Sequence, residues 1–245
     1  MKYLIGIDDT DNKDSRGTGY RARMMAGRLH EHGFAEVLSI TRHQLFFHPD
    51  IPYTSQNSSA CLEAESTDAD LLHSFCRDFL LADCAPGSDA GLCIIPEESV
   101  NEEIISFGHN AKSIILKQSD AVALARKHNI LLEGLTGTKD GVIGALAGCG
   151  LRKSGNDGRC IWLKGKELRD FNGIYTAGEL LSMINVDIIT DMHGKHVAKH
   201  DRIFTDNWLR PVIKNNKITI IATEETCKTH EWRIATKEYI KSISD

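Results

Sequence analysis

Residues 2–11 read KYLIGIDDTD, an apolar run that stops abruptly at a group of aspartates. The segment Lys2–Asp8 has the β-branched and aromatic side chains that suit a pleated strand. Its apolar centre predicts burial, so the acidic residues that follow mark the end of the strand. The first element of the fold is therefore predicted to be a buried strand whose carboxyl end carries a loop of carboxylates.

From this strand outward, helical and extended patterns alternate through the first hundred residues. Apolar residues recur at helical spacing after residue 18, and Gly33 can stop that helix. The predicted elements are strand Lys2–Asp8, helix Thr18–Gly33, strand Ala35–Phe47, strand Ser58–Glu65, a helix capped by Ser66 or Thr67 with an apolar face through Leu71, Leu72, Phe75, Phe79 and Leu80, and strand Ala90–Pro96. The order β-α-β-β-α-β is that of the ferredoxin-like split unit, so we expect an α/β (α+β) fold.

The second part of the chain is predicted to form a separate α/β subdomain. The polar segment PEES follows the strand that ends at residue 96, so we expect subdomains at residues 1–98 and 99–245. The predicted helices are Asn101–Asn110, Gln118–His128, Gly141–Gly150 and Thr176–Ile184. The predicted strands are Ile130–Leu135, Cys160–Lys164, Val186–Thr190, Ile203–Thr205, Arg210–Ile213 and Ile218–Thr223.

The composition is that of a globular protein, and we expect it in the cytoplasm. Of 245 residues, 41% are hydrophobic and 26% charged, and the net charge is −5. That charge disfavours strong non-specific binding to nucleic acid, although a local basic groove is compatible with it. No apolar run approaches the ~20 residues that span a bilayer, and the N-terminus lacks the features of a signal peptide. The seven cysteines show no C-x-x-C spacing, which predicts buried reduced thiols.

The acidic run Asp8-Asp9-Thr10-Asp11, with Asp14 beyond it, is the first candidate site. Its carboxylates repel one another, so gathering them costs free energy unless a cation neutralises them. Carboxylate oxygens at a strand end suit Mg²⁺, which takes one or two carboxylates together with phosphate oxygens and water. On an extended chain Asp9 and Asp11 would point one way and Asp8 the other. The alternative is a solvated acidic turn.

A second segment, Gly17–Ala22 (GTGYRA), matches the pattern G-x-G-x-x-A. A dinucleotide-binding fingerprint must follow its strand within a tight turn, and here a long acidic loop intervenes. The spacing therefore disfavours the Rossmann interpretation. The glycines still allow a helix N-terminus to approach an anion.

A third segment, Gly134–Ala145, leads from a strand through a loop of Gly, Thr and Lys into a small-residue helix. Backbone N–H groups, two hydroxyls and an ammonium make this a candidate phosphate cradle, although it is not a Walker A loop. The alternative is a helix packed tightly through its small residues, and both interpretations can hold together. The predicted nucleotide contacts are Thr10, Gly137, Thr138, Lys139, Gly141 and Gly144.

A fourth segment holds His193, His196 and His200 after Asp191. Three imidazoles could ligate a transition metal. Lysines interleave with the histidines and the segment has the composition of a β-turn, so we favour a solvated loop.

Three segments together resemble the archaeal tRNA-isoleucine agmatinylcytidine synthetases. The opening Gly6–Asp11 (GIDDTD) is similar to that family's start, and His48–Tyr53 (HPDIPY) is similar to its asparagine-proline-asparagine-isoleucine-proline-tyrosine stretch. Gly141–Ala147 (GVIGALA) is similar to its small-residue helix, and Asp89–Gly91 falls near its asparagine-proline-glycine turn. The three segments keep the family's order and span most of the chain to about residue 160.

The resemblance implies an ATP-dependent enzyme with a kinase-like domain beside a ferredoxin-like one. Carried over, Asp8, Asp9 and Asp11 would hold Mg²⁺ and the ATP phosphates and act in catalysis, and residues 137–144 would line the nucleotide site. The sequence departs from the family at Thr54–Ser58, where basic residues are replaced, and at Asp140, where the family has arginine. The family continues into an OB-fold and a zinc ribbon, neither of which we expect here.

These observations predict an Mg²⁺-dependent, ATP-binding enzyme that transfers a phosphoryl or adenylyl group to an acceptor that the sequence does not identify. The departures favour an acceptor other than tRNA. Two alternatives stay open: a tRNA-modifying enzyme, or a subunit of one that works with a partner, and a non-catalytic nucleotide-binding regulatory protein.

Overall fold

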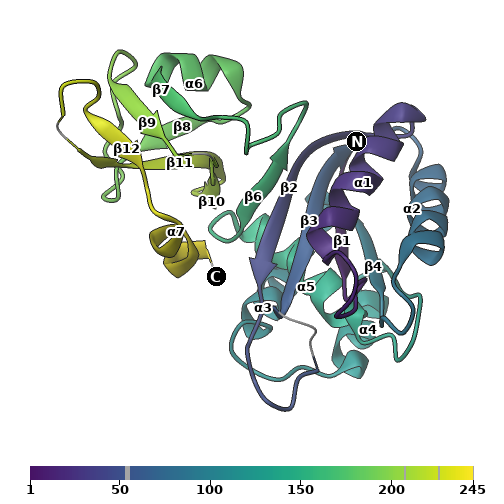
Figure 1. The fold of residues 1–245 in the computed structure, drawn as a ribbon. Coiled ribbons are helices and arrows are strands. Elements are labelled where there is room, and N and C mark those ends of the chain that lie inside the picture. Colours follow the sequence, from purple (N-terminus) through teal and green to yellow (C-terminus); the bar gives the residue numbers. More distant parts are fainter. Residues whose placement is uncertain (53–55, 207, 226, 245) are drawn as a thin grey trace. The chain divides into compact units, whose positions relative to one another are not determined.

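A computed structural model describes residues 1–52, 56–206, 208–225 and 227–244 and divides the chain into two compact units, Met1–Ser154 and Gly155–Asp245 (Figure 1). The expected boundary at residues 98/99 thus falls inside the first unit. The reason is that residues 99–154 add a strand to the sheet and bury a helix against it, so they share its core.

The first unit is built on an antiparallel sheet. Strand β1 (Lys2–Asp8) pairs with both β3 (Ser58–Glu65) and β4 (Gly91–Pro96), and β3 also pairs with β2 (Glu36–Gln44). The spatial order β4-β1-β3-β2 is the one that a split β-α-β unit produces, so the predicted ferredoxin-like fold is confirmed. Strand β5 (Leu131–Gly134) extends the sheet beyond β4.

Helices cover both faces of this sheet (Figure 1). Helices α1 (Thr18–Glu31) and α2 (Ala69–Asp83) lie on one face, and α5 (Gly141–Ser154) lies on the other with α3 (Glu102–Asn110) and α4 (Gln118–Lys127). Strand residues alternate between the two faces. Leu4, for example, belongs to the apolar cluster around α3 and α5.

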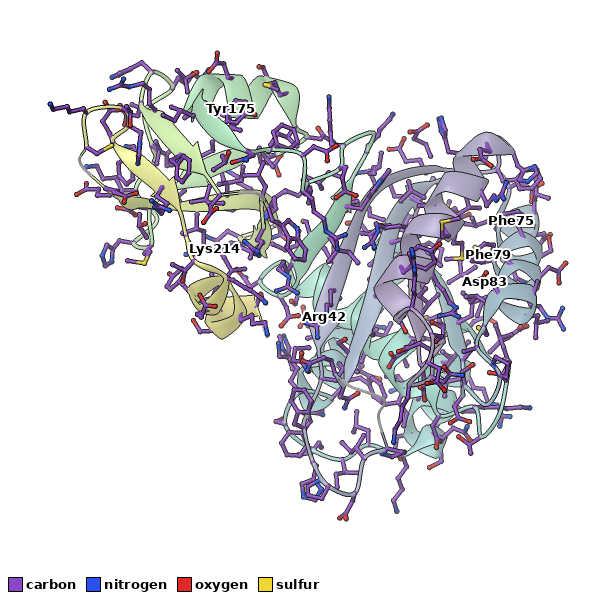
Figure 2. All side chains as sticks on the ribbon, in the orientation of Figure 1. Arg42, Phe75, Phe79, Asp83, Tyr175 and Lys214 are labelled. Atoms are coloured by element: carbon purple, nitrogen blue, oxygen red, sulfur yellow. The ribbon has the colours of Figure 1, made fainter. Side chains whose placement is uncertain are left out.

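Helix α2 begins later than predicted. Its N-cap is Asp68, whose carboxylate accepts the N–H of Leu71 at 2.9 Å, whereas the Ser66 hydroxyl donates to a backbone carbonyl at 2.8 Å. Leu71 is therefore on the exposed side of the helix. Phe75 and Phe79 project from α2 and are half-buried (Figure 2), with ring centroids 6.3 Å apart. The fully buried face of the helix consists of Leu72, Cys76 and Leu80.

Helix α5 lies in direct backbone contact with the sheet because glycines stand on both sides. A Cβ at Gly6 of β1 would overlap the carbonyl of Ala145, and one at Gly91 of β4 would overlap the backbone of Gly141. The predicted tight packing of the small-residue helix is therefore confirmed. It fixes the N-terminus of α5 beside the carboxyl end of β1.

The second unit consists mainly of strands around its own apolar core. The hairpin β10–β11 turns at Asn215 and Asn216, both with positive φ, as a type I′ turn requires. The elements of this unit are β6 (Arg159–Leu163), β7 (Gly173–Thr176), α6 (Ala177–Met183), β8 (Ile188–Thr190), β9 (Arg202–Thr205), β10 (Val212–Lys214), β11 (Lys217–Glu224), β12 (Trp232–Ile234) and α7 (Lys237–Ser244). The sequence missed β7, β12 and α7.

All seven cysteines are free thiols, and five of them are buried, as predicted; Cys84 is half-buried and Cys227 is exposed. Within the described part of the chain, no helix has the length and apolar character needed to cross a membrane.

Candidate functional site

A pocket of about 370 Å³ opens in the first unit where β1 ends. Its lining contains a set of acidic residues, called the acidic wall below, and a set of apolar residues, called the apolar wall. The acidic wall is formed by Asp8, Asp9, Asp11, Asp50 and Asp140, and the apolar wall by Leu45, Ile51, Pro52, Ala111, Ile114, Ile115, Leu116 and Ile143. The structure thus brings the acidic run and the start of α5 to one place, although they are far apart in the sequence.

Asp8, the last residue of β1, rests against α5. A Cβ at Gly144 would overlap the Asp8 carboxylate, so only glycine leaves room for it. Burial raises the pKa of Asp8 to about 8, and the negative charges of Asp9 and Asp11 add to this rise. The positive charge of Arg42, which Figure 2 labels, opposes it. Without a bound cation, this environment therefore favours the uncharged form of the Asp8 carboxyl group.

Asp9 leaves the strand geometry altogether. Its φ of 52° lies in the left-handed region, so the alternation of side chains expected along an extended chain stops at Asp8. That expectation was wrong, because all three aspartates line the same pocket. Burial raises the pKa of Asp9 to about 6, with further contributions from the carboxylates of Asp89, Asp11 and Asp140.

Asp11 and Thr10 are tied to the start of α1. The Thr18 hydroxyl donates to Asp11 Oδ1 at 3.0 Å, and the buried Thr10 hydroxyl donates to Thr18 at 3.1 Å. Gly17 is the N-cap of the helix. The glycines were expected to let an anion approach the N-terminus of this helix. In the structure, that anion is the Asp11 side chain. Thr10 is not among the residues that line the pocket.

The loop before α5 reaches the pocket only at its end. Gly141 and Gly144 line the pocket, whereas Gly137, Thr138 and Lys139 do not. The Thr138 N–H donates to the Asp89 carboxylate, and Gly137 packs closely against the same residue.

The first N–H groups of α5 already have acceptors. Gly141 donates to the Asp89 carbonyl at 2.9 Å, Val142 to Lys139 at 3.3 Å and Ile143 to Asp140 at 3.0 Å. These three N–H groups therefore already have hydrogen-bond partners, and phosphate binding by the loop stays a prediction. Among the described residues that line the pocket, the one Lys or Arg is Lys117, at the N-cap of α4.

Sequence reasoning gave no site role to Asp89 or Lys117. Asp89 follows a turn and its N–H donates to the Asp9 carbonyl at 3.1 Å, which holds the two acidic loops together. In the sequence, Asp89 could have been noticed because it directly precedes the predicted strand at residues 90–96. Asp140 belongs to the range 137–144 that the resemblance placed at the nucleotide site, and it departs from the arginine expected there. Lys117 carried no signal, because its position depends on how α3 and α4 fold back over the sheet.

No group of three or more His, Cys, Asp or Glu side chains that could hold a metal ion occurs in the described residues. Metal binding by Asp8, Asp9 and Asp11 stays a prediction. The histidine segment forms a turn in which the Asp191 carboxylate accepts N–H groups of His193 and Lys195, each at 2.8 Å, and His193, His196 and His200 are exposed. Tyr53 of the family-like stretch, and Thr54 and Ser55 of the departure that follows it, lie outside the described residues.

The fold and the pocket define a ferredoxin-like α/β unit with an acidic pocket at the end of its first strand. No family model matches the chain. The chain is 27% identical over 155 residues to TiaS of Methanosarcina acetivorans, a 2-agmatinylcytidine synthetase for an isoleucine tRNA, and the match covers 60% of this chain and 35% of that protein. The chain thus spans about a third of the length of this curated relative.

Solved structures agree with this similarity. The crystal structure of a tRNA fluorescent labeling enzyme matches with a TM-score of 0.54 and 25% identity, over 61% of this chain and 36% of that one. A complex of TiaS with its isoleucine tRNA and ATP matches with a TM-score of 0.54 and 24% identity, again over 61% and 36%, which shows the shared fold. The resemblance to the agmatinylcytidine synthetases is confirmed over the part of the chain that these matches cover.

Proposed function

We propose that this chain is an ATP-dependent enzyme that modifies tRNA, by itself or as a subunit that works with a partner. The observation that carries the proposal is the pocket in which Asp8, Asp9 and Asp11 meet the start of α5, in a chain similar to a tRNA-modifying synthetase. The similarity favours tRNA over the unidentified acceptor to which the departures from the family pointed. The tRNA-dependent alternative is thus better supported than our first interpretation.

The pocket has the two chemical characters that a nucleotide requires. Its apolar wall, with Ile114 and Ile115 partly exposed, can cover a base and ribose, as ligand pockets commonly do. Its acidic wall would repel a triphosphate unless a cation came with it. Lys117, which lines the pocket, is our candidate for a direct phosphate contact, in addition to Lys139 of the preceding loop.

The residues on the acidic wall suit Mg²⁺. Burial and mutual repulsion raise the pKa values of Asp8 and Asp9, so their charged forms are costly unless a cation is bound. Asp8, Asp9 and Asp11 would hold the ion, with Asp11 oriented by its bond to Thr18. Bound Mg²⁺ would supply charge neutralisation for phosphoryl or adenylyl transfer.

In this proposal the protein acts mainly by holding the carboxylates in fixed positions, and no protein group forms a covalent bond to the substrate. Asp8 is fixed against Gly144, and Asp9 is fixed by the bond between its carbonyl and the Asp89 N–H. Because Asp8 and Asp9 take up protons near neutral pH, cation binding must release protons and should strengthen as pH rises from about 6 to about 8. Charged groups fixed in position before the reaction can stabilise the charge that develops in the transition state, and Asp8 and Asp9 with a bound cation would form such a group.

The proposal is tested by two binding measurements on the full chain. Thermal unfolding is recorded with ATP, with Mg²⁺ and with both, since a ligand that binds only the native state raises the midpoint. Gel shifts then use bulk tRNA at moderate salt. A midpoint rise that needs both ATP and Mg²⁺, together with tRNA binding, supports the proposal. ATP binding without any effect of tRNA would leave a nucleotide-binding regulatory protein, and no response to ATP would reject the site.

A further inference from the structure

Trp208 in the second unit has two arginine side chains against its ring. The guanidinium carbon of Arg169 lies 4.7 Å from the ring centroid, and that of Arg210 lies 4.5 Å from it. Both distances fall within the ~6 Å over which the face of an indole attracts a cation. These three side chains are called the arginine–tryptophan patch below.

The patch is held in place by the core of the second unit. Trp208 is half-buried and packs against the apolar cluster of this unit. The next residue, Leu209, is fully buried, and its N–H donates at 2.9 Å to the carbonyl of Leu168, which directly precedes Arg169. Nη1 of Arg210 donates at 3.0 Å to the Trp208 carbonyl. The two segments that carry the patch are therefore joined by their backbones.

The positive charge of the patch has no carboxylate beside it. Within the described part of the chain, neither Arg169 nor Arg210 forms an ion pair, whereas the exposed Arg202 lies 2.7 Å from Glu231. Nε of Arg210 is buried, and it has no hydrogen-bond acceptor among the described residues. The patch thus offers both uncompensated charge and an unused donor.

A third guanidinium group adds to this charge. Burial, and then the positive charge of the 8% exposed Arg159 on β6, lowers the pKa of Arg210. The carboxylates of Glu238 and Asp206 act in the opposite direction, although neither forms an ion pair with Arg210. Gathering like charges costs free energy unless an opposite charge offsets it, so the patch favours an anionic ligand.

The composition of the patch indicates which anion it suits. Guanidinium groups donate to phosphate, and their planes and an indole also offer surfaces on which a nucleobase can stack. The loop that carries Arg169 also has the exposed Lys164 and Lys166. Residues 155–245 contain 14 Lys and Arg against 13 Asp and Glu, so the excess negative charge of the chain lies in the first unit. The second unit therefore does not repel a polyanion as a whole.

We propose that the arginine–tryptophan patch binds a single-stranded segment of RNA, with Arg169 and Arg210 on its phosphates and a base stacked on the guanidinium and indole planes. This inference rests on the proposed function for the identity of the polymer. The carboxylates of the pocket in the first unit repel an RNA strand, so its binding requires a cationic surface elsewhere on the chain. The patch supplies such a surface.

The test measures how tightly the full chain binds a fluorescein-labelled oligouridine of about 12 nucleotides, by fluorescence anisotropy without ATP, at about 50 to 200 mM salt. Arg169→Gln and Arg210→Gln should each weaken binding about fivefold to tenfold, because each removes a charge-assisted contact with phosphate. Each should also reduce the steepness of log affinity against log salt by about 0.7, the value for one phosphate contact on a single strand. A purely structural defect would lower the active fraction and leave this slope unchanged.

Two further variants separate charge from geometry. Arg202→Gln is the matched control, because this arginine already has Glu231 as its partner, and it should change the affinity less than about twofold. Arg210→Lys keeps the charge but not the planar group, so it should retain the salt dependence and still bind the strand more weakly.

The inference is overturned if the wild type does not bind the oligonucleotide at the lowest salt, or if Arg169→Gln and Arg210→Gln behave like Arg202→Gln. It is also overturned if free uridine monophosphate competes as well as the unlabelled strand, which would leave a site for phosphate alone. Thermal unfolding of the wild type with ATP and Mg²⁺ distinguishes this inference from the proposed function. A chain that binds the strand without gaining stability from ATP and Mg²⁺ keeps the patch and loses the proposed function, and the opposite result does the reverse.

Discussion

Gly144→Ala is the substitution that most directly probes how α5 holds the acidic pocket. The new methyl group would occupy the position of the Asp8 carboxylate, so Asp8 must move or α5 must shift away from β1. Gly27 is the matched control. It lies inside another 14-residue helix, α1, and a Cβ there would meet nothing within 4 Å.

Both substitutions gain the helix propensity of alanine over glycine, but only Gly144→Ala forces extra volume into a packed site. Replacing glycine by alanine inside a helix stabilises a protein by about 1 kcal/mol. Forcing extra volume into a packed site costs about 1–3 kcal/mol. Gly27→Ala should therefore raise the unfolding free energy by about 1 kcal/mol, and Gly144→Ala should lie about 1–3 kcal/mol below it. Displacement of Asp8 should also abolish any stabilisation by ATP with Mg²⁺.

The assay must report on the first unit. All three tryptophans, Trp162, Trp208 and Trp232, belong to the second unit, so tryptophan fluorescence would follow the wrong transition. Urea unfolding is therefore monitored by far-ultraviolet circular dichroism, and hydrogen exchange of peptides from β1 and α5 locates the change. Equal stabilisation by both substitutions would refute the placement of Asp8 against α5.

Three further predictions test the electrostatics and anchoring of the site. The pKa of Asp8 is raised in the folded state, so the stability linked to its protonation is complete below about pH 4 and is lost as pH rises through about 8. Asp8→Asn should therefore flatten the pH dependence of the unfolding free energy, measured with urea in the absence of divalent cations. Arg21 is 7% exposed, and its Nε donates at 2.9 Å to the carbonyl of Asp83, the last residue of α2. Arg21→Met should therefore lower the unfolding free energy by about 1–3 kcal/mol. Arg28→Met, at an exposed position, is the control and should change it little. Lys117→Met should weaken ATP binding about fivefold by calorimetry, and a larger loss in Lys139→Met would assign the phosphate contact to the loop instead.

Much of the first unit could be predicted from sequence because its signals are local. The strand Ser58–Glu65 was predicted with its observed bounds, and the stop at Gly33 agrees with its φ of 69°. The domain boundary failed because a break in local pattern does not reveal packing. Strand β5 is short and only half-buried, and nothing in its four residues shows that it pairs with β4.

The site was predictable in part for the same reason. Asp8, Asp9 and Asp11 lie within one short run, and Gly141 and Gly144 belong to one helical pattern, so both groups could be found. The hydrogen bonds that occupy the first N–H groups of α5 could not be predicted, because their carbonyl acceptors depend on the turn geometry of the preceding loop.

In the second unit, the three-residue strand β12 was not predicted, whereas the equally short β8 and β10 fall within longer or overlapping apolar segments that were predicted as strands.

The central claim is tested most directly by ATP consumption measured with Mg²⁺, with and without tRNA, for the wild type, Asp9→Asn and Asp14→Asn. Asp14 belongs to the same acidic run but is exposed and does not line the pocket, so it is the matched control. The account predicts consumption that tRNA stimulates, that Asp14→Asn retains and that Asp9→Asn loses. Activity that survives in Asp9→Asn, or that ignores tRNA in every condition, would contradict it.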